Sequence, residues 1–197
     1  MSFKIKDHYY NKAKKDNYLA RSVYKLEELD NKYKIMKQGD QIIDLGYHPG
    51  SWSQYCAKKI GNTGQVIGID IKPINKQLLT SQNITIFQKD IFEISSVTDL
   101  GLNQKVNVVI SDMAPNTTGI KSVDQIKSLN LVEMVFELLP ILLIENGNFV
   151  IKVFDGNDAQ SFLKSQRKRF SKFNYFRPKS TRTTSKEFFV TGTGFQG

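Results

Sequence analysis

QIIDLGYHPGSWSQ, residues 41–54, places a glycine turn between an apolar, β-branched run and a helical pattern. A glycine turn after a first strand lets a ligand approach the backbone at the carboxyl edge of a parallel sheet. Bulky Tyr47 and His48, followed by Pro49, stand where dinucleotide enzymes need glycine to seat a pyrophosphate. The turn therefore predicts a ligand without phosphates, although such a turn can also serve only to pack a strand against a helix.

Similar apolar runs recur along the chain and alternate with helical patterns. Their spacing predicts strands at 41–45, 65–70, 84–88, 106–111, 148–154, 173–176 and 187–191. It predicts helices at 22–29, 52–60, 122–143 and 159–170. Pro140 is expected to end or kink the third of these helices. This alternation predicts an α/β fold with a mostly parallel seven-stranded sheet and helices on both faces, forming a single domain over residues 1–197.

The longest predicted helix carries one apolar stripe, which we expect to face the sheet. Its members are Val123, Ile126, Leu129, Val132, Val135 and Leu139.

The net charge of +9 is unevenly distributed along the chain. Residues 1–37, a basic N-terminal helical segment, hold ten Lys/Arg and five Asp/Glu, whereas the basic C-terminal segment, residues 160–187, holds nine and one. Residues 38–159 hold nine bases and thirteen acids. Clustered positive charge favours a polyanion such as RNA through counterion release, although lysines also simply solubilise a surface. We therefore expect an RNA partner.

Cysteine content and hydropathy exclude several classes of protein. Cys56 is the single cysteine, so neither an intrachain disulfide nor a cysteine-based metal cluster can form, and we expect no metal site. The sequence contains no bilayer-spanning apolar run and no signal-peptide block near its start. We expect a monomeric, cytoplasmic protein without a membrane partner.

Acidic side chains follow the predicted strands at one edge of the sheet. Asp70 ends the second strand, where Rossmann-type domains hold ribose hydroxyls, and Asp90 follows the third. Asp112 ends the fourth strand. Each of these aspartates alone could be a turn or capping residue, but together they predict a ligand site. Lys152 lies inside the apolar fifth strand, where burial requires a partner, and Asp112 on the neighbouring strand is the expected one.

The chain resembles the FtsJ-type (RrmJ) family of RNA 2′-O-ribose methyltransferases. Short blocks between about Arg21 and Thr191 carry the resemblance in family order: RSVYKL (21–26), DLGYHPGSWSQ (44–54), SDMAPN (111–116), VIKVF (150–154) and SKE (185–187). The resemblance implies a Rossmann-like S-adenosylmethionine-dependent methyltransferase fold.

The resemblance also implies site residues, a cofactor and a substrate. The family's catalytic tetrad corresponds to Lys25, Asp112, Lys152 and Glu187, and its S-adenosyl-L-methionine contacts to Gly50, Trp52, Asp70, Asp90 and Asp112. The best-known substrate of the family is a uridine in the A-loop of large-subunit ribosomal RNA, free or in the assembling ribosomal subunit. Relatives acting on tRNA or mRNA caps, and a non-catalytic RNA-binding member, are the alternatives.

Methyl transfer to a ribose hydroxyl needs alignment of the reactants and removal of the hydroxyl proton. We expect Lys152 to act as the base or to orient the hydroxyl, with Asp112 as its anchor. Lys25 and Glu187 would act as electrostatic and positioning partners. The family has small residues where Tyr47 and His48 stand; these two side chains either narrow the pocket or point away from it.

Overall fold

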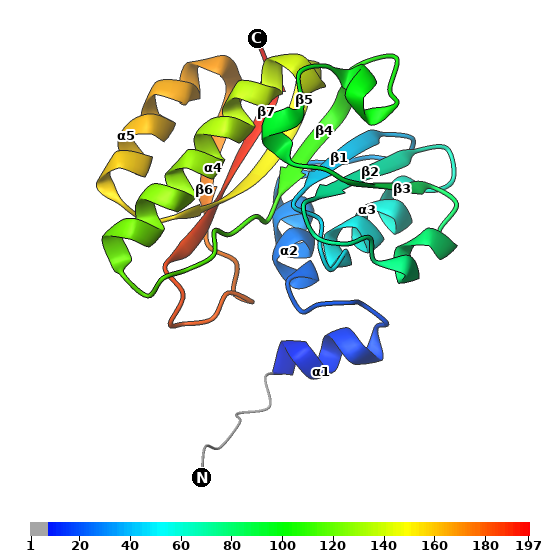
Figure 1. Cartoon of the computed structure of the whole chain (residues 1–197), viewed down its shortest axis with the longest axis horizontal. Helices are drawn as coiled ribbons and strands as arrows, with labels where there is room; N and C mark the ends of the chain where they lie inside the picture. Colours follow the sequence, from blue (N-terminus) through cyan, green and yellow to red (C-terminus); the bar gives the residue numbers. More distant parts are fainter. Residues whose placement is uncertain (1–7) are drawn as a thin grey trace.

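A computed structural model of the 197-residue chain describes residues 8–197. One seven-stranded sheet forms the centre of the molecule, in the order β3-β2-β1-β4-β5-β7-β6 (Figure 1). The strands are β1 (Gln41–Leu45), β2 (Gln65–Asp70), β3 (Ile84–Gln88), β4 (Val106–Ser111), β5 (Leu143–Phe154), β6 (Phe170–Phe176) and β7 (Glu187–Phe195).

Strand direction agrees with the predicted, mostly parallel sheet. The pairs among β1 to β5 are parallel, and only β7, inserted between β5 and β6, runs antiparallel to both of its neighbours. Because β7 is reversed, its first residues lie beside the last residues of β5, where Phe154 pairs with Glu187. The insertion therefore brings the start of β7 to the carboxyl edge of the parallel strands.

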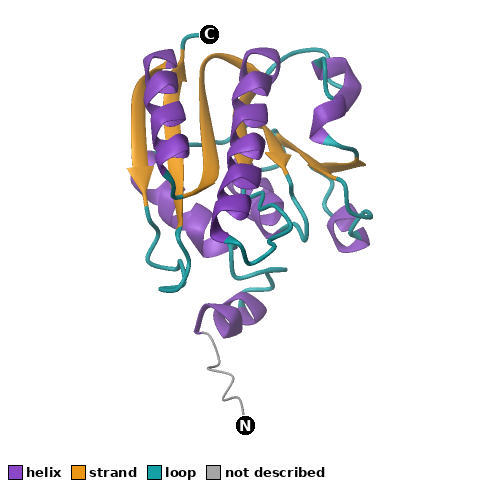
Figure 2. Ribbon diagram, turned by 60° about the vertical axis from the view of Figure 1, so that its left-hand side comes forward, coloured by secondary structure: helices purple, strands orange, loops and turns teal. Residues whose placement is uncertain are grey.

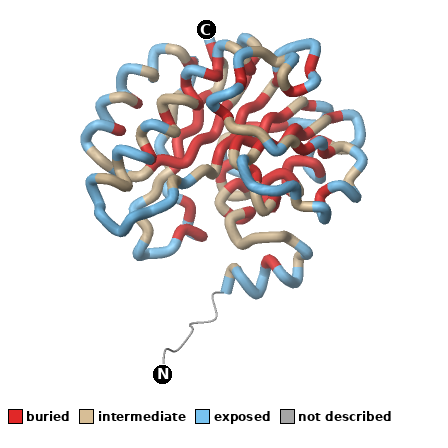
Figure 3. The backbone as a smooth tube through the Cα atoms, viewed as in Figure 1, coloured by how far each residue is buried: buried red, intermediate tan, exposed pale blue. Residues whose placement is uncertain are grey.

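Helices cover both faces of the sheet, as predicted (Figures 1 and 2). They are α1 (His8–Lys15), α2 (Val23–Tyr33), α3 (Ser51–Ile60), α4 (Lys121–Leu142) and α5 (Asn157–Gln166), with short 3-10 helices η1 (Lys76–Thr80), η2 (Ile91–Glu93), η3 (Val97–Leu100) and η4 (Arg167–Arg169). One core packs α2 and α3 against the sheet, and the other packs α4 and α5 against the opposite face. The central strands β1, β2 and β4 are mostly buried between them, whereas the edge strand β6 is largely exposed or half-buried (Figure 3). None of the helices within residues 8–197 combines the length and apolar character that crossing a bilayer requires.

Several boundaries differ from those predicted in the C-terminal half. β5 begins at Leu143 instead of 148, and β7 extends to Phe195 instead of 191. The helix predicted to reach residue 170 ends at Gln166, because Phe170 pairs with Phe195 as the first residue of β6. The buried ring of Phe170 lies 4.7 Å from that of Phe149, so tertiary packing overrides the local helical pattern.

α4 (Lys121–Leu142) agrees with the predicted helix at 122–143 to within one residue at each end. The helix runs through Pro140 and ends two residues later, and the Phe136 carbonyl that proline leaves without its usual amide accepts from Arg169 Nη1 at 3.3 Å. Ile126, predicted to face the sheet, is 57% exposed. The buried residues of α4 begin at Ser128, so its first two turns lie outside the core that the rest of the helix forms with the sheet.

The buried carboxylate of Asp30 fixes the C-terminal end of α2. Its oxygens accept from the backbone amides of Ile35 and Met36 and from the Tyr55 hydroxyl, and Lys59 Nζ lies 3.0 Å away. Since Tyr55 and Lys59 belong to α3, this carboxylate joins the two helices. A buried carboxylate is stable only with such a set of donors.

We expect Asp30→Ala to lower the free energy of unfolding by about 3 kcal/mol, because several buried donors lose their acceptor. Tyr55→Phe, which removes one of these bonds, should cost only about 1 kcal/mol. Urea unfolding of both variants measures the difference. Equal losses of unfolding free energy in the two variants would show that the Asp30 carboxylate does not hold α2 against α3.

Candidate active site

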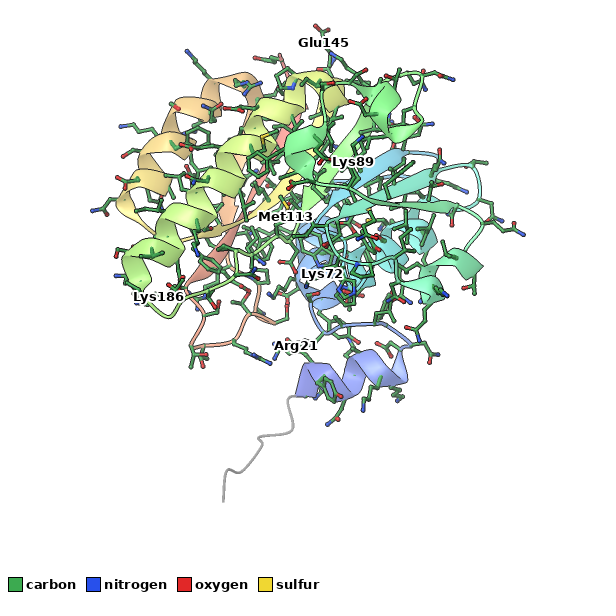
Figure 4. All side chains as sticks on the ribbon, viewed as in Figure 1. Arg21, Lys72, Lys89, Met113, Glu145 and Lys186 are labelled. Carbon is green, nitrogen blue, oxygen red and sulfur yellow. The ribbon has the colours of Figure 1, made fainter. Side chains whose placement is uncertain are left out.

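The carboxyl ends of the parallel strands enclose a pocket of about 370 Å³. Asp70, Asp90 and Asp112, from the ends of three strands, all line it, as do Lys72, Lys89 and Met113 (labelled in Figure 4). Its volume falls within the range of small-molecule sites. The three aspartates predicted from separate strand ends therefore face one cavity.

Two of these carboxylates are oriented by backbone amides. Asp70 accepts from the N–H groups of His48, at 3.1 Å, and Lys72, at 2.9 Å. Asp90 accepts from Phe92 N–H at 3.1 Å and so caps η2. A carboxylate oxygen accepts more than one hydrogen bond, so both groups can still receive donors from a hydroxyl or amino group in the pocket.

Gly50 and Trp52 lie at the start of α3, outside the lining of this pocket. Gly50 has φ +114°, and a Cβ there would meet the Leu78 side chain at 2.2 Å, so both conformation and space require glycine. The Trp52 indole points toward α2 and donates to the Ser22 carbonyl at 2.9 Å. The Trp52 side chain holds the turn against α2, so Gly50 and Trp52 can offer a ligand their backbone N–H groups at the start of α3.

The two bulky residues of the glycine turn diverge. Tyr47 is buried at 3% exposure and packs beside Gly68, and its hydroxyl accepts from Asn75 N–H at 3.3 Å. His48 lines the pocket. The sequence left open whether these side chains narrow the pocket or point away from it. Tyr47 points away, whereas His48 forms part of the pocket lining.

Lys152 is buried inside β5 at 8% exposure and pairs with Asp112, as its sequence context predicts. Nζ lies 3.1 Å from Asp112 Oδ1 and also donates to the Asp112 backbone carbonyl. Asp112 therefore contacts the amine while lining the pocket. The amine is held at the border between the pocket and the sheet interior.

A second ion pair, between Lys25 and Glu187, lies beside the first. Burial raises the pKa of Glu187, but the charge and hydrogen bond of Lys25, aided by the charge of Lys152, outweigh this effect and hold the pKa below its usual value. Both lysines therefore act on one carboxylate. The four residues predicted from α2, β4, β5 and β7 are brought together.

Asp44, not identified from the sequence as a functional residue, lies behind the site in β1 and is fully buried. Burial raises its pKa to about 7; the hydrogen bond from Ser53 Oγ, at 2.6 Å, opposes the rise, and the charges of Asp112 and Asp70 add to it. A carboxylate inside an apolar strand was the available sequence signal. Asp44 ties β1 to α3 and thereby fixes the turn between them.

The loop before β7 is held on α2 by charged side chains. Glu28 accepts from the N–H groups of Lys179, at 2.7 Å, and Ser180, at 2.9 Å, and Arg21 donates to the Ser180 carbonyl. The two basic segments therefore meet near Arg21 and residues 177–186. They meet at the carboxyl edge of the parallel strands, here called the catalytic edge, on the lower side of Figure 1. The first seven residues of the N-terminal segment lie outside the described residues.

The first half of the basic C-terminal segment lies away from the catalytic edge. Arg167 and Lys172 flank Phe170, which pairs with Phe195 at the far end of β7 from Glu187. Arg169 is occupied within the fold: besides Phe136 O, it donates to Gln166 Oε1 at 3.0 Å. The antiparallel direction of β7, which could not be read from the sequence, separates the two halves.

The fold is an open α/β sheet in which β7 is antiparallel to its neighbours, and its pocket has hydroxyl acceptors beside a buried amine. This combination defines the class of α/β methyltransferases. Residues 18–195 match the model of the FtsJ-like methyltransferase family. The chain belongs to this family.

Relatives at the level of sequence and structure agree with this assignment. The chain is 45% identical over 196 residues to the ribosomal RNA large subunit methyltransferase E of Oleidesulfovibrio alaskensis, covering 98% of this chain and 94% of that protein. It is 43% identical over 193 residues to the protein of that name from Brachyspira hyodysenteriae, covering 98% and 97%. A Plasmodium falciparum structure assigned as a ribosomal RNA methyltransferase superposes with a TM-score of 0.78 at 27% identity, covering 91% of this chain and all of that one.

The raised pKa of Asp44 predicts a pH-dependent stability. The folded chain holds this proton more tightly than the unfolded chain, so the stabilisation is complete below pH 4 and is lost as the pH rises through about 7. In Asp44→Asn this contribution is absent. Relative to Asp44→Asn, wild type should lose about 3 kcal/mol of unfolding free energy between pH 4.5 and 8, measured by urea unfolding. Parallel pH profiles for the two proteins would contradict a neutral Asp44.

Proposed function

We propose that the chain transfers a methyl group from S-adenosylmethionine to a ribose 2′-hydroxyl of large-subunit ribosomal RNA, at a uridine of the A-loop. The names of its relatives support the ribosomal substrate. The basic loop at the catalytic edge supports an RNA partner, because phosphate contacts position a nucleic acid without reading its sequence.

One observation carries the proposal: Asp112 contacts the Lys152 amine and also lines the pocket. A methyl donor in the pocket and an acceptor at the amine would therefore meet at this side chain. Positioning of this kind supplies much of the acceleration of an in-line displacement.

The pocket residues fit S-adenosylmethionine. Asp70 can accept from the ribose hydroxyls and Asp90 from the adenine amino group, while Gly50 and Trp52 offer backbone N–H groups at the start of α3. The negative charge of Asp112 suits a sulfonium. When bound, this cofactor supplies an electrophilic methyl group.

The tetrad residues have distinct roles in this proposal. Lys152 orients the 2′-hydroxyl and, in its neutral amine form, accepts the hydroxyl proton, and Asp112 anchors the amine by two contacts. Lys25 and Glu187 form a second pair whose charges act on Lys152 and fix the acceptor side of the site. With the cofactor bound, the hydroxyl oxygen would attack the methyl carbon, its proton would pass to Lys152, and the carbon–sulfur bond would break to leave the neutral thioether S-adenosylhomocysteine.

The substrate is tested with labelled cofactor and separated RNA classes from a strain lacking this activity. Label should enter large-subunit ribosomal RNA, free or in particles, and mapping of nuclease-resistant ribose methylation should place it in the A-loop. Label confined to tRNA or capped mRNA would replace the ribosomal assignment; absence of label from every RNA class would overturn the proposed activity.

We expect Lys152→Ala to lower kcat by about 10²- to 10⁴-fold, because the hydroxyl loses the group that takes its proton. Single-turnover assays measure the rate, and calorimetric titration with S-adenosylmethionine verifies that the pocket is intact. Lys152→Met, which preserves side-chain volume, guards against a folding defect, and Lys105→Ala, at an exposed lysine, is the matched control. Near-wild-type turnover in a cofactor-binding Lys152 variant would refute the role.

A further inference from the structure

We infer that the chain holds a second RNA contact surface, remote from the catalytic edge and directed at the phosphate backbone. It is an open groove of about 680 Å³, here called the far-edge groove. Four cationic residues line it, from the last turn of α5, from η4 and from β6: Lys164, Arg167, Lys168 and Lys172. This inference rests on the proposed function, in that the partner is the RNA substrate.

The position of the groove separates it from the acceptor site. Phe170, in the groove, pairs with Phe195, whereas Glu187 pairs with Phe154 at the catalytic edge. The eight residue steps along β7 between these pairs span about 26 Å. A nucleotide held at Lys152 therefore cannot itself reach the groove, but a structured RNA can span both places.

The groove is strongly and uniformly positive. The sequence contains no acidic residue between Ala159 and Lys186, and within residues 8–197 none of the groove's lining residues is acidic. All four cationic residues are exposed, in contrast to the neighbouring Arg169, which is committed to carbonyl and amide oxygens. Like charges gathered in this way repel each other, and a polyanion relieves the repulsion while releasing its counterions.

The surface between the groove and the catalytic edge also suits RNA. Tyr175 of β6 is 45% exposed and lies in a neighbouring groove with Arg177, in the loop that α2 holds at the catalytic edge, and with one acidic residue, Asp155. Exposed aromatic rings beside arginine are common stacking sites for unpaired bases. Basic and aromatic side chains thus continue along β6 from the far-edge groove toward the active site.

Lysines on an exposed edge strand can also serve only to prevent edge-to-edge association of sheets. Either sign of charge meets that need, whereas only positive charge binds phosphate. Charge reversal at the groove therefore distinguishes the two roles.

The test variant is Lys168→Glu/Lys172→Glu, and the control is Lys58→Glu/Lys105→Glu, which makes the same change in charge at exposed lysines on the other half of the sheet. Equilibrium binding is measured with a long large-subunit rRNA fragment and with a short A-loop hairpin, over a range of salt concentrations. For the long RNA, the test variant should bind about 10-fold or more weakly, with a salt slope smaller by about 2. Its binding and methylation of the hairpin should match wild type.

If the control pair loses as much affinity as the test pair, the effect comes from the net charge of the whole protein and not from the groove. That result would overturn the inference. Unchanged binding of the long RNA, or an equal loss on the hairpin, would overturn it as well. If wild type methylates the hairpin while the groove variant behaves normally on both RNAs, only this inference fails. If wild type methylates neither of these RNAs nor large-subunit particles from a strain lacking this activity, the proposed function fails first.

Discussion

The ion pair between Lys152 and Asp112 is the constraint on which the site depends. An amine inside an apolar strand is stable only if its charge and hydrogen-bonding capacity are satisfied, and Asp112 provides both its carboxylate and its backbone carbonyl. The parallel pairing of β4 with β5 brings the two residues together. Since Asp112 also lines the pocket, the residue that makes burial of the amine possible is the one that directs it toward a ligand.

The reversed strand β7 supplies the rest of the site. It enters the sheet at Glu187, beside the end of β5, and so delivers a carboxylate to the two lysines. The loop before it is long and basic, and Glu28 and Arg21 of the α2 region hold it by its backbone. The N-terminal and C-terminal parts of the chain thus meet beside the Lys25–Glu187 pair. Asp30 fixes the C-terminal end of α2, the helix that carries Lys25.

Electrostatics differ between the two edges of the sheet. At the catalytic edge, Lys152 and Lys25 are matched by Asp112 and Glu187, and the loop of residues 177–186 adds basic side chains around these pairs. At the opposite edge, the far-edge groove has cationic residues without acidic neighbours in its lining, among the residues described. Because such unmatched charge acts over about a Debye length, it suits a large polyanion better than a small substrate.

The sequence by itself determined β1 to β4 to the residue, the alternating α/β order and the pairing of Lys152 with Asp112, because apolar periodicity and strand-end carboxylates are local signals. Lys25 and Glu187 were expected only from the family resemblance, and the fold pairs them with each other. The sequence did not determine that Phe170 leaves a helical pattern to pair with Phe195, or that Tyr47 turns away from the pocket. Only tertiary structure decided these, since each depends on a partner far along the chain. The same holds for the two halves of the basic C-terminal segment: charge is written in the sequence, but the direction of β7 assigns it to an edge.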